Sequence, residues 1–201
     1  MLTRAVLDRR TATARKRALR GEENTMKFYE ALGLEPRLAL DSEDLKKRFY
    51  ERSRQWHPDR FGRAAASERQ QALDNTALIN DGFRTLKDPV SRAEYFLESN
   101  NIPPSKNPPP ELLEEVFELN MALEELREGD SSARPQLESA RERFTAMLAE
   151  SSTELTALFA KFDQAQDQQA LQQIRQVLDR RRYVSNLLRD VEKELNVQLS
   201  N

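Results

Sequence analysis

The sequence contains no cysteine, a single histidine and only five glycines among its 201 residues. Without cysteine the chain has no disulfide framework, no thiolate nucleophile and no cysteine-based zinc site, which fits a reducing compartment. No apolar run approaches the roughly 20 residues that span a bilayer. The formal net charge is −2, so bulk electrostatics do not favour nucleic-acid binding. We therefore predict neither a membrane segment nor a nucleic-acid partner.

Helix-forming residue types make up most of the chain. Charged residues account for 33% and hydrophobic residues for 38% of the sequence, and Glu, Arg, Leu, Gln and Ala dominate while β-branched residues are few. This composition predicts an all-α fold.

Prolines mark the boundary between two helical regions. Five of the nine prolines fall in SNNIPPSKNPPP, residues 99–110, which predicts a short, semi-stiff spacer that resists collapse. We expect four segments: a basic, disordered tail at 1–24, a helical domain at 25–98, the linker at 99–110 and an antiparallel three-helix bundle at 111–201.

The basic tail at 1–24 has three interpretations. It carries seven Lys and Arg residues against Asp8, Glu22 and Glu23, so it suits a disordered tail, an Arg-rich transit peptide or a nucleic-acid arm. Met26 is also a conceivable start of the chain. We expect a cytoplasmic protein, with the mitochondrial matrix as the alternative if the tail is a transit peptide.

Local signals place the helices of the first domain. Gly33 suits the end of a first helix, and Asp41 suits the N-cap of a second. Pro58 ends that second helix, because the residue before a proline disfavours α conformation. Apolar residues mark a third helix after the 57–66 loop: Leu73, Ala77, Ile79, Phe83 and Leu86. Asp88 and Pro89 suit the N-cap and first turn of a fourth.

The bundle region has a regular apolar pattern of its own. Its first helix carries a seam at 4-3-4-3 spacing, formed by Leu112, Val116, Leu119, Leu123 and Leu126. Residues 129–132 suit a turn before a long second helix, and a less distinct turn near 162–167 precedes the last helix.

The only histidine lies in the tripeptide His57-Pro58-Asp59. A His and an Asp suit a general-base pair or two metal ligands, but no nucleophile motif and no further His or Cys accompany them, and we expect Pro58 to splay the two side chains apart. A simple polar loop between antiparallel helices is the plain alternative. The preceding helix is strongly basic, however, and a rigid loop beside a one-signed surface suits docking on an acidic partner. The basic residues are Lys46, Lys47, Arg48, Arg52, Arg54 and, after the loop, Arg60.

Residues 26–98 resemble a J-domain. The resemblance rests on the basic second helix and on WHPDRF, LINDGFRTLKDP and SRAEYFL in the family's order and spacing. It implies a helical hairpin whose second helix and loop dock on a DnaK-type chaperone ATPase and stimulate its ATP hydrolysis. The implied chaperone-binding residues are His57, Pro58, Asp59, Lys46, Lys47, Arg48, Arg52 and Arg60. The chain has no phosphate-binding loop of the G-x-x-x-x-G-K-[ST] kind, so we predict a co-chaperone without enzymatic activity, cofactor or metal.

The order of J-domain, short spacer and bundle of about 90 residues resembles the HscB-type co-chaperones of iron–sulfur cluster assembly. In that family the bundle binds an iron–sulfur scaffold protein of the IscU type. Here the first bundle helix carries a second apolar row outside its seam, flanked by acids, which suits an exposed protein-binding patch. The alternative is that the bundle buries both rows. The resemblance implies that the scaffold-binding residues include Leu113, Phe117, Glu118, Glu125 and Tyr183. Met121 is added to this set because it belongs to the second apolar row.

Two other functions are compatible with the sequence. The bundle suits a different client or self-association as a coiled coil, although we expect a monomer. Nucleic-acid binding through residues 1–24 is a third hypothesis, but few aromatic residues interleave with the arginines of the tail, as a stacking surface requires.

Overall fold

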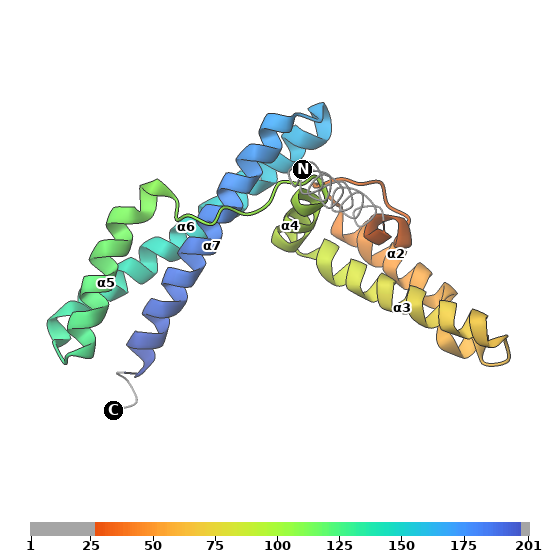
Figure 1. Cartoon of the computed structure of the whole chain (residues 1–201), viewed down its shortest axis with the longest axis horizontal. Helices are drawn as coiled ribbons and strands as arrows, with labels where there is room; N and C mark the ends of the chain where they lie inside the picture. Colours follow the sequence, from red (N-terminus) through yellow and green to blue (C-terminus); the bar gives the residue numbers. More distant parts are fainter. Residues whose placement is uncertain (1–26, 198–201) are drawn as a thin grey trace, which may run out of the picture. The chain divides into compact units, whose positions relative to one another are not determined.

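The computed structural model describes residues 27–197, which are helical or loop and contain no strand (Figure 1). The predicted all-α fold is confirmed. The predicted basic tail at 1–24 lies outside the described residues. The chain forms two compact units, one containing 27–103 together with 162–166 and the other containing 104–161 together with 167–197.

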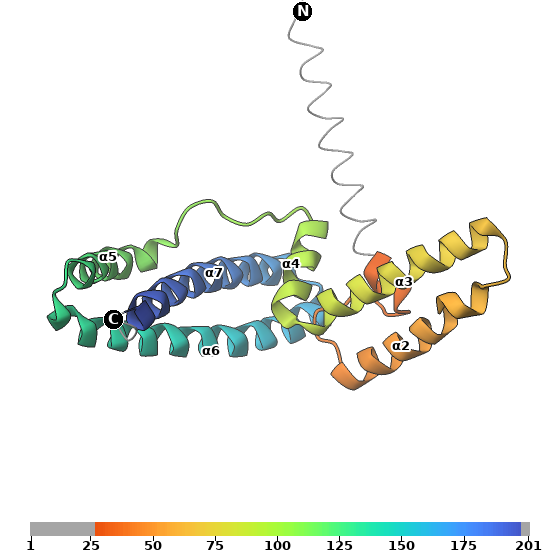
Figure 2. The same ribbon diagram turned by 90° about the horizontal axis from the view of Figure 1, so that it is seen from below.

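The first unit is a helical hairpin with a helix on either side of it in sequence. A short helical segment at 27–31 is followed by α2 (Ser42–Gln55), the 3-10 turn η1 (Pro58–Phe61), α3 (Ala66–Lys87) and α4 (Pro89–Ser99). Helices α2 and α3 lie side by side and are joined by the loop that contains η1 (Figure 2).

Caps set the ends of these helices as the sequence predicts. The Asp41 carboxylate accepts hydrogen bonds from the backbone N–H groups of Glu43 and Asp44 at 2.9 and 2.8 Å, and Asp88 caps α4 with Pro89 in the first turn. Gly33 adopts φ +65°, a conformation that favours glycine. A Cβ at Gly33 would lie 2.7 Å from an Arg52 guanidinium nitrogen, so this turn accepts only glycine without rearrangement.

The core of the first unit lies between its helices. Tyr29, Leu32, Leu38, Leu45, Ile79 and Leu86 are almost completely buried, and the rings of Phe49 and Phe83 stack with centroids 4.2 Å apart. The third helix exists as predicted, but Leu73 and Ala77 are exposed and lie outside the core. The buried guanidinium of Arg92 donates to the carbonyls of Leu38 and Leu86 at 2.7 and 2.5 Å.

The second unit is the antiparallel three-helix bundle that the sequence predicts. It contains the 3-10 turn η2 (Pro110–Leu112), α5 (Leu113–Arg127), the 3-10 turn η3 (Ser131–Ala133), most of α6 (Arg134–Ala165) and α7 (Gln168–Val197). The last residues of α6, 162–165, belong to the first unit. The seam residues of α5 join the bundle core: Leu112, Leu119, Leu123 and Leu126 are buried, and Val116 packs against them.

The Pro-rich linker is not a free spacer. The Ser105 N–H donates to Oδ2 of Asp179 at 3.1 Å, and the Arg182 guanidinium donates to the Ser105 carbonyl at 2.6 Å. Asp179 also forms a buried ion pair with Arg175 at 3.1 Å. A buried carboxylate needs donors, and Ser105 supplies one in a stretch where prolines cannot. The middle of the linker is therefore held against α7 by polar contacts that its proline content does not predict.

Candidate functional site: an exposed His-Pro-Asp turn and an apolar row on α5

The His-Pro-Asp turn projects from the end of α2. His57 adopts φ −59° and ψ 127°, the extended conformation that a following proline imposes, so α2 ends at Gln55. Pro58 then opens the 3-10 turn η1. The His57 and Asp59 side chains are 57% and 89% exposed, so both are available to a partner.

The two side chains are not splayed apart as predicted. The backbone N–H of Asp59 donates to Nδ1 of His57 at 3.3 Å, and the Asp59 carboxylate lies 3.5 Å from the same nitrogen. The prediction is wrong because the tight 3-10 turn that starts at Pro58 carries Asp59 back over the imidazole, which caps the turn.

Contacts behind the turn fix its position. The ring of Trp56 stacks on that of Phe61 at 5.8 Å with an interplanar angle of 8°, and the Thr76 hydroxyl of α3 donates to the Trp56 carbonyl at 2.9 Å. The Arg60 guanidinium donates to the Arg54 carbonyl at 3.2 Å. The predicted docking residue Arg60 thus links η1 to the end of α2. These contacts fix the loop from which the His57 and Asp59 side chains project.

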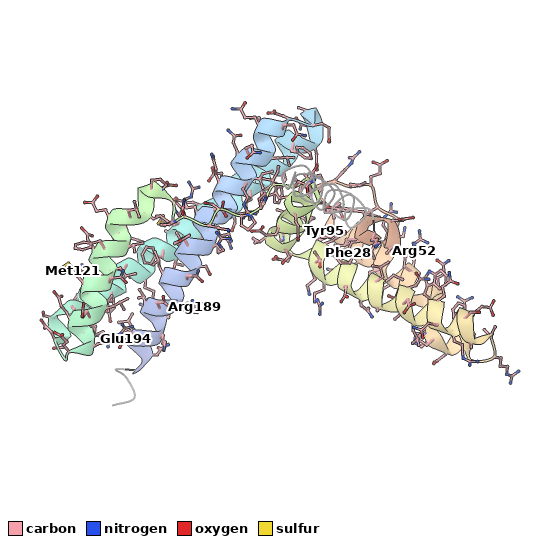
Figure 3. All side chains as sticks on the ribbon, viewed as in Figure 1. Phe28, Arg52, Tyr95, Met121, Arg189 and Glu194 are labelled. Atoms are coloured by element: carbon pink, nitrogen blue, oxygen red, sulfur yellow. The ribbon has the colours of Figure 1, made fainter. Side chains whose placement is uncertain are left out.

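The predicted basic residues of α2 divide between two sides of the helix. Lys46 and Lys47 are exposed, and a 2.7 Å hydrogen bond to Glu43 raises the pKa of the Lys46 ammonium, which keeps it charged. Arg48, in contrast, pairs with Asp44 at 2.8 Å and donates to the Gly33 carbonyl. Arg52, labelled in Figure 3, lies against the same glycine.

The second apolar row of α5 is exposed. Leu113, Phe117 and Met121 are 53%, 66% and 49% exposed, and their i, i+4, i+8 spacing places them along one side of the helix. Met121 is labelled on α5 in Figure 3. The alternative in which the bundle buries both rows is therefore wrong.

The acidic residues predicted beside this row are also exposed, whereas the tyrosine on α7 is not. Glu118 and Glu125 are exposed on α5. Tyr183 is half-buried and packs against the bundle core. The structure thus gathers five of the six predicted scaffold-binding residues on α5 and leaves Tyr183 with a packing role besides any contact with a partner.

Two features of these surfaces were not predicted from the sequence. Tyr50 is 63% exposed on α2, one turn from both Lys46 and Arg54, and that i±4 spacing was a usable signal. The attachment of Ser105 to Asp179 joins residues 74 positions apart, and no local pattern announces it.

Neither metal binding nor a membrane span is indicated by the part of the chain that the structure describes. Within residues 27–197, three or more potential metal-ligating side chains never gather in one place. No helix in that range is long and apolar enough to cross a bilayer.

The helical hairpin with its outward His-Pro-Asp turn defines a J-domain protein, and residues 27–95 match the family described as "DnaJ domain". Residues 108–192 match the family described as "HSCB C-terminal oligomerisation domain". The chain belongs to the HscB family of J-domain co-chaperones, which are not enzymes.

Two curated relatives that align with this chain over most of their own length support this assignment. The chain is 31% identical over 172 residues to "Co-chaperone protein HscB homolog" of Vibrio vulnificus, covering 83% of this chain and 95% of the relative. A Neisseria meningitidis protein of the same description is 31% identical over 153 residues, covering 74% and 89%.

Two solved structures have the same fold. "Chaperone HscB from Vibrio cholerae" matches with a TM-score of 0.59 and 29% identity, covering 87% of this chain and 99% of that one. The human co-chaperone protein HscB matches with a TM-score of 0.61 and 22% identity, covering 83% and 81%.

Proposed function

We propose that the chain binds an iron–sulfur scaffold protein of the IscU type through its bundle and stimulates ATP hydrolysis by a DnaK/HscA-type chaperone through its J-domain. Its role is then to deliver the scaffold during iron–sulfur cluster assembly or transfer. The observation that carries this proposal is the presence, in one HscB-family chain, of an exposed His-Pro-Asp turn and an exposed apolar row on α5.

On the chaperone side, His57, Pro58 and Asp59 form the essential contact, and Lys46 and Lys47 extend the docking surface along α2. Exposed cations attract an acidic surface and accelerate encounter, and a braced turn loses little conformational entropy when it is bound. The other predicted docking residues hold the framework of this surface. Arg48 and Arg52 contact Gly33 from the other side of α2, and Arg60 donates to the Arg54 carbonyl.

On the scaffold side, Leu113, Phe117 and Met121 provide an apolar strip of one helix. Glu118 and Glu125 border it, so its composition is that of a modest protein interface with an apolar centre and a polar rim. Tyr183 contributes from α7 at the edge of the bundle core.

ATPase measurements test the proposal. The rate of a DnaK-type or an HscA-type chaperone is measured with the co-chaperone alone, with an IscU-type scaffold alone and with both together. We expect stimulation that is larger with both than the sum of the two separate effects. Additive rates with every combination would remove the delivery role and leave a J-domain protein that serves another client.

A second candidate for the bundle is self-association, since the matched family carries oligomerisation in its description and the α5 row is apolar and exposed. The expected monomer stays a prediction. Sedimentation analysis of the full chain decides between them: a single species of 23.3 kDa supports the monomer, and a concentration-dependent larger species supports self-association. Client choice and cytoplasmic location remain part of the proposal, and the bacterial relatives support the latter.

A further inference from the structure

A tyrosine occupies the centre of the exposed side of α2. Among residues 27–103, the exposed large hydrophobic side chains are Tyr50, at 63%, and Leu73, at 51%. A single exposed hydrophobic residue is ordinary. The surroundings of Tyr50 distinguish it from Leu73.

Cations lie around the Tyr50 ring on the same side of the helix. Lys46 and Arg54 are one turn before and one turn after it, and Lys47 is three residues before, which are the positions that share a helix face. All three are exposed. Lys46 is paired with Glu43. Within residues 27–197, the side chains of Lys47 and Arg54 form no hydrogen bond or ion pair.

The ring is supported from the core side. Phe49 and Tyr50 have ring centroids 5.5 Å apart at an angle of 56°, and Phe49 in turn stacks on Phe83 at 4.2 Å. An aromatic side chain that is already oriented by its neighbours loses little freedom on binding, and tyrosine is one of the residue types enriched among the anchors of protein interfaces.

The other arginines of α2 belong to a different environment. Arg48 and Arg52 lie against Gly33, so their guanidinium groups stabilise the turn before α2. The cationic side that remains open toward a partner is the one that contains Tyr50.

We propose that Tyr50 is the apolar anchor of chaperone docking, surrounded by Lys46, Lys47 and Arg54, and that it fits an apolar patch bordered by carboxylates on the ATPase domain of a DnaK-type chaperone. A purely acidic surface offers no apolar contact for the ring, and a purely apolar surface leaves three cations without solvation or partners. A surface that combines an apolar patch with carboxylates complements both the ring and the cations. The inference rests on the proposed function, because it concerns the residues with which the same partner is bound.

The test compares full-length variants in the ATPase stimulation of a DnaK-type or HscA-type chaperone that the wild-type chain stimulates. Tyr50→Ala should raise the co-chaperone concentration for half-maximal stimulation by roughly 10-fold, the loss typical of an interface anchor, while the maximal rate stays near that of the wild type. Tyr50→Phe should change it less than about twofold, since the ring carries the contact. Leu73→Ala is the matched control, because it removes an exposed side chain of the same unit on another helix.

Circular dichroism and thermal unfolding verify that each variant is folded. If Tyr50→Ala stimulates at the same concentration as Leu73→Ala, the inference is overturned and the proposed function stands. If Tyr50→Phe loses as much as Tyr50→Ala, the hydroxyl rather than the ring makes the contact, and the apolar anchor is overturned. If the wild-type chain stimulates neither type of chaperone, the proposed function fails, and the inference fails with it.

Discussion

Nδ1 of His57 accepts the backbone N–H of Asp59 at 3.3 Å while the Asp59 carboxylate lies 3.5 Å from the same nitrogen. In the neutral imidazole this hydrogen bond assigns the proton to Nε2. Nδ1 therefore stabilises the turn, and the Nε2–H group is the donor that can bind a partner. The carboxylate, 89% exposed, presents an acceptor beside it.

Replacing this imidazole should separate activity from stability. We expect His57→Gln to abolish stimulation of the chaperone ATPase, because a flexible amide reproduces neither the cap of η1 nor the orientation of the donor. The free energy of unfolding should change by less than about 0.5 kcal/mol, as for other exposed positions. Steady-state ATPase assays and thermal melts measure the two effects. Arg63→Gln, an exposed change after the turn, is the control, and full stimulation by His57→Gln would remove the turn from the mechanism.

Reversing charge on the open side of α2 should weaken docking in a salt-dependent manner. The double variant Lys46→Glu/Lys47→Glu should need roughly 10-fold more co-chaperone at low salt. The difference should shrink as added salt shortens the screening length below about 8 Å. Arg143→Glu, at an exposed position of α6, changes charge elsewhere and should have little effect. A deficit that persists unchanged at high salt would contradict an electrostatic origin.

Two phenylalanines of the bundle should respond oppositely to the same substitution. Phe117 is 66% exposed and Phe144 is 1% exposed. Phe117→Ala should reduce affinity for an IscU-type scaffold by about 1–2 kcal/mol with little change in stability. Phe144→Ala should destabilise the bundle by about 3–5 kcal/mol. Calorimetric titration and urea unfolding give the two values. Unchanged scaffold binding by folded Phe117→Ala would exclude that side chain from the interface.

The polar cluster that holds the linker should contribute to stability. Asp179→Ala removes the buried ion pair with Arg175 and the acceptor of the Ser105 N–H, and losing one member of a buried pair costs about 3–5 kcal/mol. Urea unfolding of this variant beside Asp190→Ala, which removes an exposed carboxylate, measures the difference. Equal stabilities would mean that the cluster forms without net benefit to folding.

Local chemistry explains why much of the fold was predictable. Asp41, Asp88 and Gly33 act at the helix ends where their side chains or backbone conformation suggest, and the α5 seam packs as its spacing indicates. These signals depend on residues within a few positions of one another, so they are visible in one sequence.

Other features depend on distant partners or on exact turn geometry. The exposure of Leu73 and Ala77 depends on how much of α3 the neighbouring helices cover, and periodicity does not measure coverage. The approach of Asp59 to His57 depends on the tightness of η1. The division of the α2 cations depends on Gly33, 15 residues before Arg48. The positions of the candidate site residues along the helices were therefore easier to predict than their arrangement in space.

The exposed imidazole also has a practical consequence, because it is the only one in the chain. Any spectroscopic signal from a histidine ring arises at the tip of the hairpin, without background from the rest of the protein. Proton resonances of that ring can thus follow occupancy of this tip in the unmodified polypeptide, with no label attached.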